Sequence, residues 1–529
     1  MNFSIKKIGI LTIAVALLAE DCKVREKEKP ADTSWLEEIT ISQLQQGYRE
    51  GRFTVKDVVT AYIDRIEKID RSGPTLNSVI TINPDALTIA EELDAELSGG
   101  KIRGPMHGIP VILKDNIDTH DKMPNSAGAT VLRNSFPETD SYIAMKLREA
   151  GAVILGKSNL SEWANFRGMH STSGWSGVGG LTKNPYVLDR NPCGSSSGSG
   201  VAVSANLCMI AIGTETNGSI VCPSNNNGIV GLKPTVGLLS RSGIIPISFT
   251  QDTPGPMGRT VEDVAICLGT LTGVDTSDSK SVASEGKYLT DYSKYLKKEG
   301  LNGKRIGVLK GSASFHYRVD SLFARAVEDV KKMGGTIIEI DPPDESAYEN
   351  ASWQVLLYEF KDGLNKYLQR LGSNAPVKNL KELIEFNKSD PVELRYFDQK
   401  IFELAEEKGD LNSAEYRESL AKMLKATRED GIDKLMNENR LDAIMAPTGS
   451  PAWKTDLVLG DHYMGGSSSL AAISGYPAIS VPMGFIDNLP VGVTFFGRAW
   501  SEPLLIEIAY GYEQATKHRK APKYLLSDN

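Results

Sequence analysis

The sequence predicts an α/β fold built around a largely buried β-sheet. Short apolar runs of strand length alternate with longer stretches in which apolar residues recur at helical spacing. The clearest alternation is strand, helix, strand over residues 305–310, 320–333 and 336–340, and the glycine pair 334–335 is placed to end the helix. Residues 348–439, which are rich in Glu, Lys and Leu, predict a helical cap packed on one side of that core.

The N-terminal half of the chain contributes further elements of both kinds. Residues 54–66 place apolar side chains at helical spacing behind Thr54, a residue type favoured at the N-cap. Residues 108–114 read as a short buried strand that ends in a lysine, and residues 209–216 read as a strand that leads into a glycine-containing turn. A lysine that ends an apolar strand fits a buried position.

Composition excludes several classes of function. The 529 residues carry a net charge of -8, without a Lys/Arg block or a basic stripe with interleaved aromatic residues, so nucleic-acid binding is not expected. The five cysteines and six histidines show no metal-ligand spacing, so we expect neither a metal nor another cofactor. A disulfide between two of the central cysteines stays open as an alternative, but buried free thiols are the commoner outcome.

The first 22 residues differ from the rest of the chain. Two lysines precede the apolar run 8–19, which has the length of a signal-peptide core and is short for a bilayer-spanning helix. The segment therefore predicts a signal peptide, or a lipoprotein signal with Cys22 acylated, although Asp21 departs from the small residue usual before such a cysteine. Residues 23–36 read as a linker. Because of the predicted signal segment, we expect a periplasmic or membrane-anchored protein. An uncleaved amphipathic N-terminus is the alternative.

A Gly/Ser-rich stretch at residues 193–200 is the most unusual part of the sequence. Alone it would read as a flexible linker. It is followed, however, by small apolar residues, by the predicted strand, by a second hydroxyl-rich turn at residues 213–219 and by residues 228–235. Two such turns around an apolar segment indicate backbone amides brought close to a ligand.

These segments resemble the amidase signature family. Its pattern is a Gly-Gly-Ser-Ser-Gly-Gly turn, then Gly-Thr-Asp-x-Gly-Gly-Ser, then Gly-Leu-Lys-Pro-Thr, and all three occur here in order. The interval between Ser195 and Ser219 equals the interval between the first serine of that turn and the family's nucleophile. Further matching segments are residues 108–115, 157–162, 476–484 and 489–492. The resemblance implies the amidase signature fold, a central mixed β-sheet covered by helices on both faces, as one domain over residues 37–529.

The chain departs from the family pattern at a few positions. Ser197 and Asn217 stand where the family usually has glycine, Glu215 replaces the common aspartate, and Val221 stands where many members carry arginine. With residues 251–257, these features are similar to the peptide amidase branch. They argue against a close match to the glutamine-dependent transamidation subunits or the fatty-acid amide hydrolases.

The resemblance implies a catalytic triad. Ser219 would be the nucleophile, Lys114 the base, and Ser195 the relay of the proton between them, after a cis peptide bond from Gly194. Lys114 can act as a base only when neutral, and burial is the effect that lowers a lysine pKa from about 10.4. From Lys114 alone, a structural ion pair with Asp115 is an equal alternative. No Gly-x-Ser-x-Gly elbow frames the nucleophile, so a Ser-His-Asp arrangement has little support.

Other residues would support the triad. The oxyanion hole would be formed by the backbone N–H groups of Thr216, Asn217, Gly218 and Ser219. Ser196 would support the lysine, and the side chain of Glu215 would fix the turn. Asn165 is a candidate to hold the substrate carboxamide, with an ordinary exposed loop asparagine as its alternative.

The predicted function is metal-independent hydrolysis of carboxamides, most of all the C-terminal amides of peptides, with ammonia released and an acyl-enzyme formed. The alternatives are an aryl or acyl amidase acting on secondary amides, an amidotransferase component that supplies ammonia to a tRNA-bound partner, and a non-catalytic binding lipoprotein. The expected partners are the amide substrate and, through an N-terminal lipid, a membrane. The chain would be a monomer or a homodimer.

Overall fold

The core of the molecule is one large mixed β-sheet. The structure, a computed structural model, describes residues 32–312 and 315–528. The strands of the sheet are Val79–Ile82 (β1), Pro110–Lys114 (β2), Val153–Ser158 (β3), Ile210–Glu215 (β6), Val230–Lys233 (β7), Thr253–Gly258 (β8), Arg305–Leu309 (β9), Thr336–Ile340 (β10), Ala443–Pro447 (β11), Ala478–Ile486 (β12) and Leu489–Phe496 (β13). A separate two-stranded sheet pairs β4 (Trp175–Ser176) with β5 (Gly180–Leu181).

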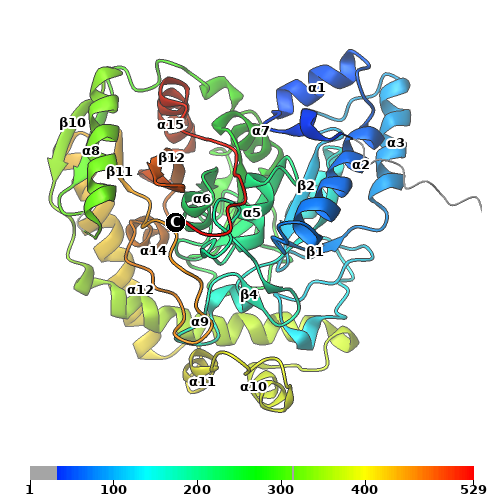
Figure 1. The fold of residues 1–529 in the computed structure, drawn as a ribbon. Helices are drawn as coiled ribbons and strands as arrows, with labels where there is room; N and C mark the ends of the chain where they lie inside the picture. Colours follow the sequence, from blue (N-terminus) through cyan, green and yellow to red (C-terminus); the bar gives the residue numbers. More distant parts are fainter. Residues whose placement is uncertain (1–31, 313–314, 529) are drawn as a thin grey trace, which may run out of the picture.

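The strand order in the large sheet is β1-β3-β2-β6-β8-β7-β12-β13-β11-β9-β10 (Figure 1). Strands β3, β2 and β6 run parallel to one another, as do β11, β9 and β10 near the other edge. Antiparallel pairs join β6, β8, β7, β12, β13 and β11 between these groups. Parallel strands need crossover connections that cover the sheet faces, so the predicted α/β class is confirmed.

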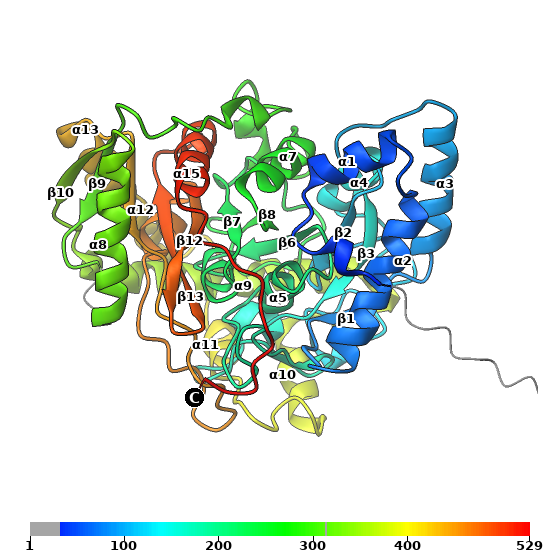
Figure 2. The same cartoon turned by 45° about the horizontal axis from the view of Figure 1, so that its top comes forward.

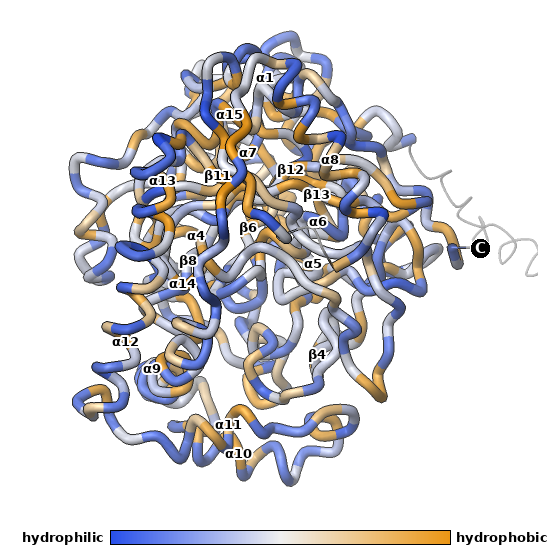
Figure 3. Tube along the Cα trace, turned by 90° about the vertical axis from the view of Figure 1, so that its left-hand side faces the viewer, coloured by the Kyte–Doolittle hydropathy of each residue, from blue (hydrophilic) through white to orange (hydrophobic). Residues whose placement is uncertain are grey.

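Helices flank the sheet on both faces (Figures 1 and 2). Successive strand residues belong to different apolar clusters: Met445 and Phe495 pack in the main core, whereas their neighbours Ile444 and Phe496 pack in a second cluster. The flanking helices are Ile41–Arg49 (α1), Val55–Arg65 (α2), Ala86–Ser98 (α3), Tyr142–Glu149 (α4), Ser197–Ser204 (α5), Val221–Asn226 (α6), Val261–Leu271 (α7), Tyr317–Lys332 (α8), Ser469–Ser474 (α14) and Glu502–Thr516 (α15). Hydrophobic colour accordingly gathers around the interior strands in Figure 3.

Local signals place several elements where the sequence predicts them. Thr54 caps α2 through its side chain and forms a reciprocal capping box with Asp57. The chain after α8 turns at Gly334, whose φ of 87° lies in the left-handed region that favours glycine. β2, β6, β9 and β10 overlap the predicted strands.

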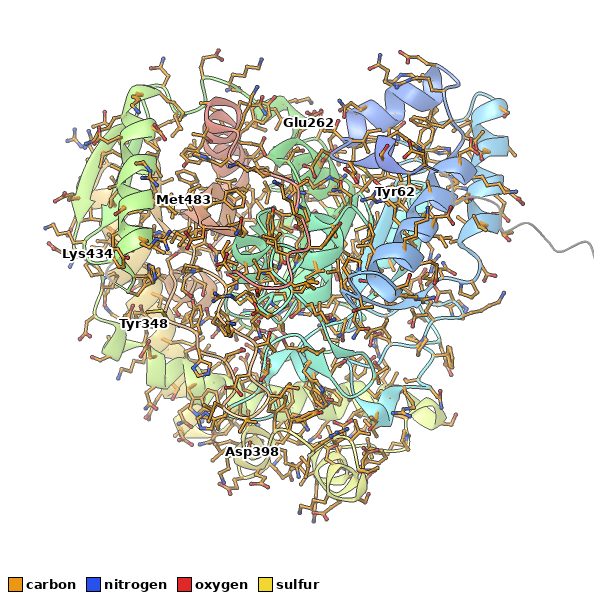
Figure 4. The ribbon with its side chains drawn as sticks, in the orientation of Figure 1. Tyr62, Glu262, Tyr348, Asp398, Lys434 and Met483 are labelled. Atoms are coloured by element: carbon orange, nitrogen blue, oxygen red, sulfur yellow. A yellow bond between two sulfur atoms is a disulfide. The ribbon has the colours of Figure 1, made fainter. Side chains whose placement is uncertain are left out.

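The region 348–439 contributes the helices Glu349–Arg370 (α9), Leu380–Ser389 (α10), Lys400–Glu406 (α11), Ala414–Thr427 (α12) and Asp433–Asn439 (α13). Tyr348, which precedes α9 and is labelled in Figure 4, is buried in the second cluster with Met423 of α12. Further along α9, Phe360 packs with Ile245 and Ile247, which lie in the loop between β7 and β8. The long helix α9 therefore ties this helical region to the loop that follows β7.

The predicted signal segment and its Cys22 lie outside the described residues. At the end of the predicted linker, Leu36 is fully buried in the main core. None of the helices in the described part of the chain is long and apolar enough to cross a membrane.

Candidate active site

Lys114 is buried on β2, an interior strand of the large sheet. It is the last residue of β2, between the parallel strands β3 and β6, and its side chain is inaccessible to solvent. Its Nζ lies 2.7 Å from Ser195 Oγ, 2.8 Å from Thr214 Oγ1 and 3.1 Å from the Thr214 carbonyl oxygen. The strand thus aims the lysine at two hydroxyl groups.

Burial governs the protonation of Lys114. Desolvation lowers the pKa of its ammonium from 10.5 to about 7, while the carboxylates of Asp252 and Glu215 act in the opposite direction. Within the described residues no ion pair includes Lys114. The neighbouring Asp115 instead accepts hydrogen bonds from Ser126 and from the Gly128 backbone, so the structural ion pair considered from the sequence is not formed.

The first Gly/Ser turn presents Ser195 to the lysine. The Gly194–Ser195 peptide bond is cis, and α5 begins at Ser197. Glycine is required at position 194 because an added Cβ would come within 2.1 Å of Ser161 Oγ. Two of the serines predicted from the sequence are therefore held by a rigid turn rather than by a flexible linker.

Ser196 contacts Thr214 rather than the lysine itself. Its hydroxyl donates to the Thr214 carbonyl at 3.1 Å and accepts from the Thr214 N–H at 3.2 Å. Its own N–H donates to the Ser219 carbonyl at 3.2 Å. Ser196 thus connects the two turns and holds the residue that binds Lys114.

The second turn leaves a row of backbone donors free. Glu215 ends β6, and its carboxylate accepts the N–H groups of Ile220 and Val221 at 2.8 and 3.0 Å. Gly218 has a φ of 82°, which the turn requires. The backbone N–H groups of residues 216–219 donate to none of the described residues. Successive backbone N–H groups without a partner can bind an anionic oxygen.

Asn217 fits the position where the family usually has glycine because its φ does not lie in the left-handed region, and its side chain contacts the start of α14. Its Oδ1 accepts from Ser468 Oγ at 2.6 Å, and its Nδ2 donates to Ser469 Oγ at 3.2 Å. Only the backbone of Asn217 is left to face a ligand. The two hydrogen bonds of its side chain stabilise the second turn.

Ser219 follows directly and is 9% exposed, the most exposed of the three predicted triad residues. Ser195 and Lys114 are fully buried. The hydrogen bonds of the described residues do not include one between the Ser219 and Ser195 side chains. The structure therefore joins Lys114 to Ser195 by a direct contact and joins the Ser195 and Ser219 turns through Ser196.

A disulfide crosslinks the same two turns. Cys193 and Cys222 are bonded, whereas Cys208 and Cys267 are free and buried. The expectation of free thiols is thus wrong for the first pair and right for the second. Sequence spacing could not find this bond, because the turns meet only after β6 and α5 have packed together.

A cavity of about 520 Å³ opens beside Thr214. Asn116, Thr214 and Thr216 line one end of it, and Thr214 is the residue that binds Lys114 Nζ. This volume is ordinary for a small-molecule site. Lys114, Ser195 and Ser219 are not among its lining residues, so the cavity reaches the predicted triad through Thr214, which binds Lys114, and Thr216, which belongs to the second turn.

Sequence reasoning missed two neighbours of the second turn, Gln251 and Asp252. Asp252 Oδ1 accepts from Thr216 Oγ1 at 2.6 Å, and Gln251 Nε2 donates to the Thr216 carbonyl at 3.3 Å. Burial raises the pKa of Asp252 to about 6. Both residues belong to the segment 251–257, whose similarity to the peptide amidases was visible in the sequence but did not indicate a role for either residue.

Asn165 is not among the residues that line this cavity. Its Nδ2 donates to Ser173 Oγ at 2.9 Å, its Oδ1 accepts from Ser171 Oγ, and the preceding residue, Ala164, lines the cavity in its place. Ser173 in turn lies beside Gly194, where an added Cβ would come within 3.2 Å of Ser173 Cβ, so Asn165 is connected to the first turn through Ser173. Across the described residues, no group of three or more His, Cys, Asp or Glu side chains could hold a metal ion.

The comparisons with known proteins identify the family. The Amidase family model matches residues 57–506. The solved structure of native peptide amidase from Stenotrophomonas maltophilia is 46% identical, with a TM-score of 0.89 over 92% of this chain and 99% of that one. A probable amidase of Arabidopsis thaliana is 40% identical over 502 residues, 94% of this chain and 93% of the relative. A glutamyl-tRNA(Gln) amidotransferase component of Acinetobacter baumannii is 34% identical over 490 residues, 91% of this chain and 96% of the relative.

Proposed function

Since the chain belongs to the amidase family and is an amidase that hydrolyses amide C–N bonds, we propose that it acts on primary carboxamides, above all the C-terminal amides of peptides. The likeness to peptide amidase at 46% identity supports this substrate class. The observation that carries the proposed chemistry is the 2.7 Å contact between the buried Lys114 Nζ and Ser195 Oγ. Together with Ser219, these residues form the proposed triad.

In the first half-reaction, Ser219 Oγ attacks the carbonyl carbon of the amide. Its proton passes to Ser195 Oγ, and the proton of Ser195 passes to neutral Lys114. A lysine pKa of about 7 leaves much of Lys114 neutral near pH 7, as this step requires. The free N–H groups of residues 216–219 stabilise the negative oxygen of the tetrahedral intermediate.

The intermediate then collapses. Lys114 returns its proton through Ser195 to the amide nitrogen, the C–N bond breaks, and ammonia leaves an ester on Ser219. Water attacks this ester and gives its proton to Lys114 by the same relay. The second tetrahedral intermediate releases the carboxylic acid, and Ser219 recovers its proton.

Two other activities remain as second candidates. The similarity to the glutamyl-tRNA(Gln) amidotransferase component favours ammonia transfer within a complex, and the size of the cavity also admits secondary amides. Paired substrates that release either ammonia or an arylamine separate primary from secondary amide cleavage. Purification of the chain in active form without a second protein argues against the transferase.

The test of the proposed function has two parts. Amidated dipeptides should yield ammonia with the purified chain, and a fluorophosphonate should label Ser219 covalently. The Ser219→Ala variant is the control for both measurements, since it lacks the hydroxyl group. Ammonia release by folded Ser219→Ala at the parent rate would overturn the assignment of the nucleophile.

Export, either to the periplasm or to a membrane through acylated Cys22, is part of the same proposal. The Cys193–Cys222 disulfide supports it, because such bonds persist mainly in oxidising compartments. Mass analysis of the mature N-terminus distinguishes an acylated Cys22 from a cleaved or retained segment. Light scattering on the purified protein decides between monomer and homodimer.

A further inference from the structure

The cavity beside Thr214 has a largely apolar wall. Beyond Asn116, Thr214 and Thr216, the chain contributes apolar side chains from the loop after β7 and from the helical region. These lining residues include Ile244, Ile245, Pro246, Ile247, Phe249 and Leu411. Such a surface favours an apolar part of a ligand, because its burial removes apolar area from water.

Each charged side chain among the described lining residues has a partner. Arg241 Nε lies 2.9 Å from Asp278 Oδ2, and Lys366 Nζ lies 2.7 Å from Asp362 Oδ2 on the same helix. Asp252 Oδ2 accepts two backbone N–H groups, and its Oδ1 accepts from Thr216. A charged ligand group entering the cavity would lose water without gaining a free counter-charge, which is unfavourable.

Two buried polar atoms of the described lining lack a partner, Ser242 Oγ and Asn116 Oδ1, and the second lies next to Thr214. Asn116 is 3% exposed, its Nδ2 donates to Thr214 Oγ1 at 3.0 Å, and its Oδ1 accepts from none of the described residues. A buried acceptor without a donor costs free energy, so a ligand N–H or O–H that reached it would bind more tightly. Through Thr214, this acceptor is close to Lys114.

We infer that this cavity holds a large, uncharged apolar group on the acyl side of the scissile amide, while Asn116 Oδ1 accepts an N–H group next to the reacting carbonyl. An amidated peptide whose last residue has a large apolar side chain offers both features. The inference rests on the proposed function and specifies its substrate class. Small amides and amides of acidic residues fit the cavity less well.

Gly363 limits the size of the apolar substrate group that the cavity can hold. It lies within α9 and lines the cavity, and an added Cβ would come within 3.0 Å of Pro246 Cγ. Any larger side chain at this position takes space from the cavity. Gly409, also in the helical region, is a matched control, because an added Cβ there meets only Tyr358 at 4.0 Å.

The first experiment compares N-acetyl amino-acid amides by ammonia release. We expect kcat/KM for the phenylalanine amide to exceed that for the alanine amide by about tenfold or more, and the α-amide of glutamate to be the poorest of the three. In Gly363→Val the ratio of phenylalanine to alanine amide should fall by about tenfold, and in Gly409→Val it should keep its parent value. Leu411→Phe, which narrows the cavity from a turn instead of a helix, should also lower the ratio.

The second experiment tests Asn116. Methylation of the backbone nitrogen of the phenylalanine amide removes the N–H group and should lower kcat/KM about tenfold in the parent enzyme. In Asn116→Ala the same methylation should have little effect, since the acceptor is gone. Equal losses in both proteins would overturn the role of Asn116.

The outcomes separate the inference from the function it rests on. Unchanged substrate ratios in folded Gly363→Val and Leu411→Phe, or rapid hydrolysis of the glutamate amide, would overturn the inference while ammonia release upheld the amidase function. Absence of ammonia from every amide would overturn the proposed function itself. Thermal melting curves of all variants confirm that each protein is folded.

Discussion

Cys193 and Cys222 are joined by a disulfide that links the segment before Ser195 to the segment after Ser219. One sulfur precedes the relay serine by two residues, and the other follows the proposed nucleophile by three. The same turns are also connected by the Ser196 N–H bond to the Ser219 carbonyl. The relative position of the two serines therefore depends on a crosslink outside the triad.

Removal of this disulfide should lower both stability and activity. For a sequence separation of 29 residues, we expect Cys193→Ser/Cys222→Ser to lose about 2–4 kcal/mol in the free energy of unfolding. The kcat for an amidated dipeptide should fall as well, because the two turns lose a restraint. Denaturant unfolding and ammonia release measure these effects. Reductant should affect the parent but leave the double variant unchanged, and full activity of the reduced parent would contradict the prediction.

Local patterns predict the elements but not the partners of the site. The helix after Thr54 and the strand that ends at Lys114 follow from periodicity and capping within a few residues. The contact between Asp252 and Thr216 spans 36 positions, and the contact between Glu359 and Ser248 spans 111. Nothing near Glu359 in the sequence marks it as a partner of the site, because its role depends on how α9 packs.

The triad itself makes the next prediction. Lys114→Ala should lower kcat by about 10²- to 10⁴-fold, since no other base contacts Ser195 among the described residues. Ser219→Ala should abolish turnover, and Ser195→Ala should cost several orders of magnitude. Ammonia release measures each rate, and a melting curve checks the fold. Lys310→Ala, at an exposed position just after β9, is the control; near-full activity of Lys114→Ala would show that another group is the base.

The pH dependence of kcat/KM should have an acid limb near pH 7. Lys114 accepts a proton only when neutral, and burial lowers its pKa to about 7. As pH rises through this value, the neutral fraction and therefore the activity should rise toward a plateau. Initial rates of ammonia release between about pH 5 and 9 measure the limb. A profile flat through pH 7 would contradict a lysine with this pKa as the base.

Asp252→Asn should move this acid limb to lower pH. The Asp252 carboxylate favours the charged form of Lys114, and its own pKa of about 6 keeps it ionised at the midpoint. Loss of that negative charge should therefore lower the lysine pKa. Asp278→Asn, which alters another carboxylate at the cavity, tests whether the shift is specific. A limb that moves upward, or stays in place, would contradict the predicted coupling.

Glu359 on α9 should position the second turn through the loop before β8. Its buried carboxylate accepts from Ser248 Oγ, from the Thr250 N–H at 3.1 Å and from Tyr416 OH of α12 at 2.7 Å. The Ser248 N–H in turn donates to Asp252, the partner of Thr216. A glutamine at position 359 offers one acceptor oxygen in place of two.

We therefore expect Glu359→Gln to lower the free energy of unfolding by about 1–3 kcal/mol, because a buried donor loses its acceptor. Loosening of the turn at Thr216 should also lower kcat more than it raises KM, since the N–H groups of residues 216–219 act mainly in the transition state. Denaturant unfolding and Michaelis–Menten kinetics on one amidated dipeptide measure the two effects. Glu349→Gln, at an exposed position of the same helix, should change neither. A stability loss with kcat and KM both at parent values would leave Glu359 a purely structural residue.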